Sequence, residues 1–150
     1  MKQQKISSDL VQDTVRQWIT AFNAHDVTTL VSLYTDDAEL FDSGMKRPRS
    51  GRAEIEQWFI QRFRSMPSIA YVPSDQVLMA DNRAAVTWTT SGRTPRRFGL
   101  PWLSRPFQAD GVSVFTLQEG HILQQRGYYD HLAVVEQVLP PLKWLLPSRL

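Results

Sequence analysis

One acidic residue in the first predicted strand is placed for chemistry. In the stretch 34–44 (YTDDAELFDSG), Ala38 and Leu40 alternate with Glu39, and the same period of two puts Asp42 on the apolar side. A carboxyl group shielded from water can act as a general base near neutral pH. The alternative is structural, because Asp-Ser-Gly is also a good turn-forming sequence. The residues alone leave both interpretations open.

Few other residues have the types or spacing that catalysis or metal binding needs. The chain has no cysteine, which excludes disulfides, thiolate catalysis and cysteine-ligated zinc. Its three histidines, His25, His121 and His131, lack metal-ligand spacing, so we expect surface or structural roles for them. Asp36 and Asp37 precede the strand, where capping and turn formation explain them. We therefore assign no metal site and no cofactor.

Basic residues gather around two predicted loops. They are Lys46, Arg47, Arg49 and Arg52 in the first and Arg93, Arg96, Arg97 and Arg105 in the second. If the loops met at the mouth of a cavity, they could steer an anionic ligand or an acidic carrier protein. Otherwise they form solvated surface. With a formal net charge of +2 and no recognition module, the sequence argues against nucleic-acid binding.

Two helices must precede the strand that carries Asp42, and one must follow it. Apolar residues recur at helical spacing over residues 10–22. Asp26 is placed to cap a short second helix over residues 27–33. After the first basic loop, a third helix is predicted over residues 53–65, where Pro67 prevents its continuation. The first half of the chain is therefore mostly helical.

Beyond residue 67 the period of the apolar residues changes from helical to two. The predicted strands are 68–80, with a break or bulge at Pro73, and 83–94, 107–117 and 121–129. They form two hairpins, and Asp130 then caps a short helix over residues 132–138. Helices placed ahead of an antiparallel run predict an α+β fold, in which one curved sheet packs on its helices.

The length and the composition of the chain fit one globular domain. The 150 residues are 42% hydrophobic and 21% charged, which is enough to build a core. We expect an N-terminal tail over residues 1–7, a domain over 8–139, and a Pro/Leu-rich tail over 140–150 that packs on the domain or on a second copy. No signal-peptide pattern and no run of about 18 apolar residues occurs. The sequence thus predicts a soluble, cytoplasmic protein without integral membrane association.

Five short segments, taken together, resemble a known superfamily. They are WITAFNAHD (18–26), LYTDDA (33–38), SGRAEI (50–55), EGHI (119–122) and RGYYD (126–130). Their order resembles the nuclear-transport-factor-2-like superfamily. The last two are similar to the closing hairpin of SnoaL-like polyketide cyclases and their relatives, the ketosteroid isomerases and limonene-type epoxide hydrolases. The resemblance spans residues 8–139 and implies a cone-shaped α+β fold, with a mostly antiparallel sheet wrapped around an apolar pocket, commonly in a homodimer.

The resemblance also implies roles for individual positions. Asp42 stands at the position of the base of the ketosteroid isomerases. Trp18 stands where those enzymes have an oxyanion-hole tyrosine, and Ser113 where they have a protonated acid, so both are candidate donors. Gly127 replaces the catalytic acid of the cyclases and epoxide hydrolases, which argues against those two chemistries. The aromatic residues expected to line the pocket are Tyr34, Trp58, Phe59, Trp88, Phe107 and Phe115.

These expectations lead to one leading function and two alternatives. The resemblance predicts a SnoaL-like protein with a pocket for a small, largely apolar carbonyl compound, such as a polyketide or steroid-like ring system. With Asp42 as base, it would move a proton next to the carbonyl, as an isomerase or cyclase does. The first alternative is a ligand-binding or dimerisation module without turnover. The second is an assembly domain of a larger complex.

Overall fold

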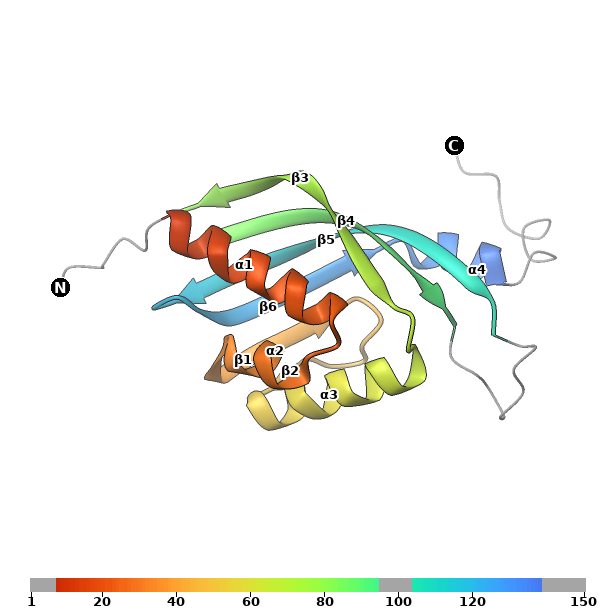
Figure 1. Ribbon diagram of the computed structural model, residues 1–150, viewed down its shortest axis with the longest axis horizontal. Helices are drawn as coiled ribbons and strands as arrows, with labels where there is room; N and C mark the ends of the chain where they lie inside the picture. The colour runs from red at the N-terminus through yellow and green to blue at the C-terminus, as the bar shows by residue number, and fades with distance from the viewer. Residues whose placement is uncertain (1–7, 95–103, 139–150) are drawn as a thin grey trace.

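A curved six-stranded sheet carries the first three helices on one side (Figure 1). The computed structural model of the chain describes residues 8–94 and 104–138. Its elements are α1 (Ser8–Asn23), α2 (Val27–Ser32), β1 (Tyr34–Asp42), β2 (Arg49–Ser50), α3 (Arg52–Ser65), β3 (Ala70–Ala80), β4 (Arg83–Arg93), β5 (Pro106–Gln118), β6 (His121–Tyr129) and α4 (His131–Val138). The strand order is β2-β1-β6-β5-β4-β3. All neighbouring strands are antiparallel except β1 and β6, which confirms the α+β prediction.

The predicted helices form where their capping residues placed them. The side chain of Asp26 accepts a hydrogen bond from the backbone N–H of Thr29 at 3.0 Å and so caps α2. Asp130 accepts one from the N–H of Ala133 at 2.9 Å and caps α4 in the same way. Helix α3 ends at residue 65, ahead of Pro67, as predicted. Short polar side chains thus set the helix boundaries that frame the sheet.

The predicted break in β3 is a shift of register against β4. The pairing with β4 is regular up to Pro73 and resumes in a new register at Val77. Proline has no backbone N–H, so it cannot donate to the ladder, and the strand adapts with this irregularity. The two hairpin turns lie where they were predicted, and Asp81 and Glu119 adopt positive φ angles of 54° and 50°. The period-two pattern therefore predicted the antiparallel strands correctly.

The core lies between the helices and the concave face of the sheet. Inward-facing residues alternate along β4, where Ala84, Val86 and Trp88 are buried. Aromatic rings stack across this layer: the ring centroids of Phe22 and Tyr71 are 4.2 Å apart, and those of Tyr71 and Trp88 are 4.6 Å apart. This stack joins α1 to β3 and β4 and forms one wall of the site.

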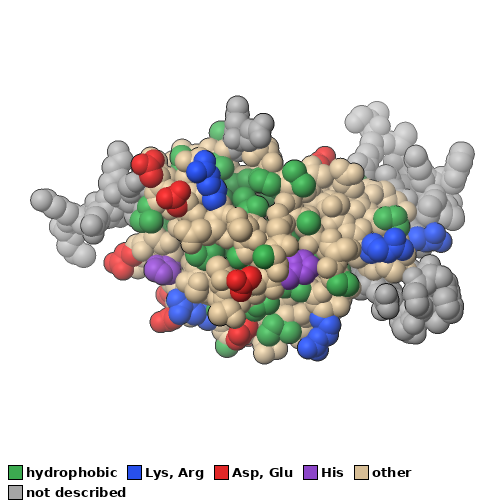
Figure 2. Space-filling view, viewed as in Figure 1, with side chains coloured by type: hydrophobic (Ala, Val, Ile, Leu, Met, Phe, Trp, Pro, Cys, Tyr) green, Lys and Arg blue, Asp and Glu red, His purple; other side chains and the backbone are tan. Residues whose placement is uncertain are grey.

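The first basic loop is held by the chain's own acidic groups. Arg47 pairs with Glu54 at 2.9 Å, and Arg52 pairs with Asp36 at 3.1 Å. Arg52 also donates two hydrogen bonds to the backbone carbonyl of Tyr34, which fixes the start of β1. On the face shown in Figure 2, acidic and basic side chains lie scattered among apolar ones. These two arginines therefore have structural contacts of their own.

Part of the sequence predictions concerns segments that the structure does not describe. The predicted tails, 1–7 and 140–150, lie outside the described residues, as do Arg96 and Arg97 of the second basic loop. In the part that is described, Arg93 donates a hydrogen bond to the carbonyl of Ser104 at 2.7 Å, and this contact joins the two ends of that loop. No helix within 8–94 or 104–138 has both the length and the apolar character needed to cross a membrane.

Candidate functional site

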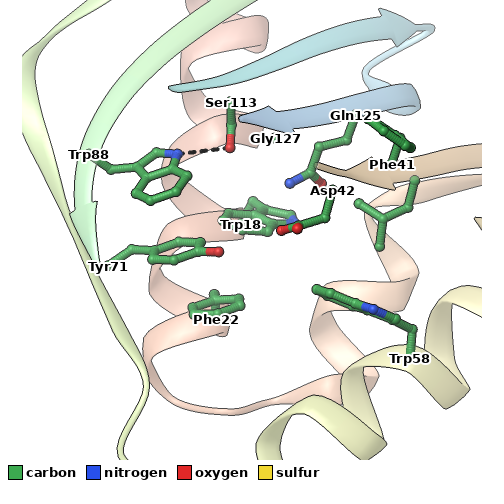
Figure 3. A pocket seen from close by; sticks show the side chains of 11 residues that line it. Trp18, Phe22, Phe41, Asp42, Trp58, Tyr71, Trp88, Ser113, Gln125 and Gly127 are labelled. Atoms are coloured by element: carbon green, nitrogen blue, oxygen red, sulfur yellow. Dashed lines mark hydrogen bonds between the residues drawn. The ribbon is translucent and has the colours of Figure 1, made fainter. Parts of the chain in front are cut away.

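A hollow opens between the concave face of the sheet and the helices, beside the end of β1 (Figure 3). It is lined by Trp18, Phe22, Leu40, Phe41, Asp42, Trp58, Tyr71, Trp88, Ser113, Gln125 and Gly127. It measures about 290 Å³ with its open mouth included, and its interior has room for about one water molecule. Most of the wall is aromatic, and Asp42 is the one acidic residue in it.

Asp42 combines a turn contact with a position in the wall of the hollow. The period of two along β1 buries its side chain, which is only 7% exposed. Its Oδ1 accepts a hydrogen bond from the backbone N–H of Gly44 at 2.9 Å, so the turn fixes the carboxylate. Its Oδ2 faces Gly127, where an added Cβ would lie 3.8 Å from that oxygen. One carboxylate oxygen is thus held by the turn and the other borders the hollow.

Ser113 lies on the other side of Gly127 from Asp42. Its Oγ would be 3.8 Å from a Cβ at that glycine, and it accepts a hydrogen bond from the indole N–H of Trp88 at 2.9 Å. Because the oxygen is the acceptor in that bond, the hydroxyl proton stays available to a ligand. The register of β5 and β6, which pairs Ser113 with Gly127, produces this arrangement.

The indole N–H of Trp18 is used inside the protein. It donates to the hydroxyl of Tyr34 at 2.8 Å, and that hydroxyl in turn donates to Oε1 of Gln125. An indole has a single N–H, so Trp18 contributes an aromatic wall to the hollow rather than the donor expected from the sequence. Tyr34 is fully buried and lies outside the lining; burial raises its pKa far above the usual value. This chain of contacts ties α1, β1 and β6 together.

The other aromatic candidates divide between the wall and the core. Trp58 and Trp88 line the hollow with Asp42, and Phe115 lines a smaller adjoining recess that also borders on Trp88. Phe59 and Phe107 are buried outside both linings. Phe59 follows Trp58 on α3, and one helical residue turns the side chain by about 100°, so the two cannot share one face.

Sequence reasoning missed Tyr71, whose hydroxyl points into the hollow toward Asp42 (Figure 3). The ring is held by stacking on Phe22 and Trp88. Burial raises the pKa of this phenol far above the usual value, with the Arg62 guanidinium opposing the rise and the Asp42 carboxylate adding to it. The phenol therefore stays protonated and can donate a hydrogen bond at neutral pH. The alternation that buries residues 69 and 71 ahead of Pro73 is the signal that could have found it.

Two further residues that the sequence did not single out face the same region. Tyr129, at the end of β6, is half-buried, and burial raises its pKa, with the Asp42 carboxylate adding to the rise and Arg62 opposing it. Arg62 lies on α3 with its guanidinium carbon 5.3 Å from the centroid of the Trp58 ring. The i to i+4 spacing of Trp58 and Arg62 is present in the sequence and is compatible with a contact on one helix face. It does not show that Arg62, among the arginines of α3, is the one near the hollow.

The histidines make local contacts. The Nε2 of His25 lies 2.8 Å from the carbonyl oxygen of Ile69, and its ring stacks on Phe63. The Nε2 of His131 lies 2.7 Å from the Oγ of Ser43, which links the start of α4 to the turn after β1. In the described part of the chain, no three His, Asp or Glu side chains are grouped so that they could hold a metal ion.

Residues 15–125, most of the chain, match the SnoaL-like domain. The chain belongs to the SnoaL-like family. This match confirms the resemblance drawn from the five short segments. It runs from within α1 into β6 and includes every residue that lines the hollow except Gly127.

Solved structures of several SnoaL-like and ketosteroid isomerase-like proteins share its fold. A protein from Shewanella denitrificans OS-217 assigned as a SnoaL-like polyketide cyclase superposes with a TM-score of 0.76 at 16% identity, covering 87% of this chain and 98% of that one. A Catenulispora acidiphila protein of ketosteroid isomerase-like fold, in complex with trimethylamine, gives 0.72 at 17%, covering 84% and 92%. TerC, co-crystallised with polyporic acid, gives 0.72 at 16%, covering 86% and 98%. At these identities the likeness establishes the fold.

Proposed function

We propose that this SnoaL-like protein binds a small, largely apolar carbonyl compound in the hollow and transfers a proton next to the carbonyl, with Asp42 as base. The observation that carries the proposal is the position of that carboxylate. The Gly44 N–H orients Oδ1, while Oδ2 borders an aromatic-walled space. A base that is fixed in a largely dry site needs little reorganisation when it accepts a proton.

The negative charge that forms on the carbonyl oxygen needs hydrogen-bond donors. Tyr71 supplies a phenol that stays protonated, and the hydroxyl of Ser113 supplies a second, weaker donor. Together with Asp42, they allow enolisation, which is the common step of isomerisations and of many cyclisations. Trp18 and Gln125 are engaged with Tyr34 and serve to hold the walls in place.

A ring-sized ligand requires the mouth of the hollow to widen. Its interior has room for about one water molecule, and most of the lining residues are buried. Trp58 is only half-buried, so it is placed to move aside when a ligand enters. The proposal is supported by two neighbours of the same fold that were crystallised with small molecules, TerC with polyporic acid and the Catenulispora protein with trimethylamine.

The competing function is ligand binding without turnover. It is favoured by the loss of one expected donor, since the indole N–H of Trp18 is already bound to Tyr34. Removing a single donor of this kind typically costs about 10²–10³ in rate. A site with Tyr71 and Ser113 as its donors would then bind a carbonyl compound and activate it weakly.

Hydrogen–deuterium exchange at the acidic carbon of a simple ketone separates the two functions. We would use 2-tetralone, a bicyclic aromatic ketone, and follow its α-protons by NMR in D₂O, with affinity measured by calorimetry. We expect the protein to accelerate exchange and Asp42→Asn to lower that acceleration about 10²–10⁴-fold, because the general base is lost. The affinity for the ketone should change far less.

The matched control is Asp37→Asn, the same substitution at an exposed acid of the same strand. It should leave exchange unchanged. If the protein accelerates exchange and Asp42→Asn accelerates it equally, Asp42 is not the base. Binding of 2-tetralone without any accelerated exchange would instead favour a ligand-binding module.

A further inference from the structure

We infer that Arg62 receives an acidic oxygen of the ligand, so that the natural ligand carries a carboxylate or an ionised enol as well as its carbonyl group. The inference rests on the proposed function in one respect, because it places the ligand in the same hollow. It adds a second recognition point, on α3, apart from Asp42.

Arg62 has no acidic partner in the described part of the chain. The ion pairs there join other groups: Arg47 with Glu54, Arg52 with Asp36, and Arg126 with Glu39. Its Nε is shielded from solvent and has no hydrogen-bond partner among the described residues. Buried donors are nearly always satisfied, so an exception beside a hollow needs an explanation. A ligand that accepts from this nitrogen provides one.

The guanidinium lies next to residues that line the hollow. It lies over the ring of Trp58, a residue of the lining, and its charge acts on the phenols of both Tyr71 and Tyr129. The hydroxyl of Tyr129 would be 2.9 Å from a Cβ placed on Gly44, in the turn that fixes the base. Arg62 is therefore near both phenols, one of which lies beside the turn that holds the base.

Asp42 acts on the same two phenols as Arg62, and yet no ion pair joins the two charged groups. The cation and the base are thus held apart, with Tyr71 and Tyr129 close to each of them. If they paired directly, the base would be neutralised and the guanidinium would be used up. Arg62 interacts with the phenols, while among the described residues neither its charge nor that of Asp42 is paired with an opposite charge.

This chemistry selects for a planar oxygen anion. A guanidinium donates through a rigid fork that matches a carboxylate or an ionised enol, and such charge-assisted bonds are about twice as strong as neutral ones. The phenol of Tyr129 can donate to the same oxygen. A neutral oxygen can accept a hydrogen bond from Nε but leaves the charge of the guanidinium uncompensated, and an anion bound without Arg62 would face the Asp42 carboxylate with no cation beside it. The ligand's acidic oxygen therefore lies on the Arg62 side, and its reactive carbon lies beside Asp42.

Two pairs of bicyclic probes test this inference by calorimetry on the full chain. The first pair is 2-naphthoate and its neutral isostere 2-naphthamide. The second is 2-hydroxy-1,4-naphthoquinone, an enol ionised at neutral pH, and its neutral methyl ether. We expect the protein to bind at least one anion about tenfold or more tightly than its neutral partner, which corresponds to one charge-assisted hydrogen bond. The pair with the larger preference distinguishes a carboxylate from an ionised enol.

The matched variants are Arg62→Met and Arg64→Met, the latter at an exposed arginine of the same helix. Arg62→Met should abolish the preference for the anion, measured as the ratio of the affinities for the anion and for its neutral partner, and Arg64→Met should preserve that ratio. Arg62→Lys, which keeps the charge but not the fork, should retain part of the preference. Thermal unfolding would show that each variant is folded.

The inference is overturned if neither anion is preferred, which includes no measurable binding of either anion, or if Arg62→Met keeps the preference. In that case Arg62 serves to pack on Trp58. Measuring the same preference in Asp42→Asn separates this outcome from failure of the proposed function. Removing a nearby negative charge should keep or increase the preference for the anion, whether or not Asp42 is the base of a reaction.

Discussion

Asp42 reaches the hollow because two local patterns coincide at one residue. The alternation along β1 turns its side chain inward, and the turn that follows supplies the N–H of Gly44 to one carboxylate oxygen. A buried carboxylate is costly unless it is hydrogen-bonded, and this bond offsets part of the cost. The other carboxylate oxygen, Oδ2, is not bound by the turn and faces the space beside Gly127.

At the same scale, Tyr71→Phe tests whether the phenol stabilises charge on the substrate. We expect the exchange of 2-tetralone to fall about 10²–10³-fold, because one preorganised donor is lost. The ring can keep its stacking on Phe22 and Trp88, so the midpoint of thermal unfolding should change little. Tyr128→Phe removes an exposed phenol and is the control. Unchanged exchange in Tyr71→Phe would exclude the phenol as a donor.

Some residues of the site could be predicted from the sequence and others could not. Alternation along the strand indicated that Asp42 faces inward, and the family resemblance favoured a pocket position over a turn; in the structure Asp42 borders the hollow. The bond between Trp18 and Tyr34 joins two elements, so only their packing could show that the expected donor is occupied. Arg62 is one of several basic residues in the first half of the chain. Whether its Nε has a hydrogen-bond partner depends on side chains from other elements, and among the described residues it has none. The sequence pattern cannot show this.

At the scale of elements, two glycines on neighbouring strands shape the hollow in opposite ways. Gly111 of β5 pairs with Trp88 of β4, and an added Cβ would lie 2.3 Å from Cη2 of the indole and 2.5 Å from the carbonyl oxygen of Tyr128. Gly127 of β6 pairs with Ser113, and an added Cβ would meet nothing closer than 3.8 Å. Because Gly111 has no side chain, the indole of Trp88 can pack directly against the backbone of β5. Because Gly127 has none, a space remains beside the Asp42 carboxylate.

Gly111→Ala and Gly127→Ala therefore form a matched pair. Gly111→Ala should lower the free energy of unfolding by about 1–3 kcal/mol, because the indole of Trp88 and the strand backbone must shift. Gly127→Ala should stay within about 0.5 kcal/mol of the parent but bind 2-tetralone more weakly, because its methyl group enters the hollow. Urea unfolding and calorimetry give the two quantities. Equal destabilisation by both variants would contradict this account of the hollow.

The elements themselves were largely predictable because most are long and strongly periodic. The helices and the strands β3 to β6 begin and end within a few residues of the expected positions. The two-residue strand β2 was read as loop, since two residues carry no period. The parallel pairing of β1 with β6 joins segments far apart in the chain, and no local pattern could show it. The spacing of apolar residues thus predicts where helices and strands lie better than it predicts which strands pair.

At the scale of the whole molecule, the face of the sheet away from the helices carries apolar side chains. Val72 and Leu78 of β3 and Tyr128 of β6 are 64%, 68% and 42% exposed. The registers extend this surface, because Ala85 lies opposite Leu78 and Val114 lies beyond Ala85 in the same row. Polar residues, Thr87, Thr89 and Asp110, lie between these side chains. Exposed apolar side chains gathered on one face of a domain are typical of a contact with another protein.

We predict that this outer face joins two copies of the chain in a homodimer, as expected from the sequence. Most soluble oligomers are symmetric pairs, in which the same patch on each copy meets its twin. Sedimentation velocity should therefore give twice the mass of the chain. Leu78→Glu should shift the protein to monomer, because it would bury an unpaired charge at the contact. Gln17→Glu, on the exposed side of α1, is the control and should remain a dimer. A monomeric parent, or a Leu78→Glu variant that remains dimeric, would show that this face is not the interface.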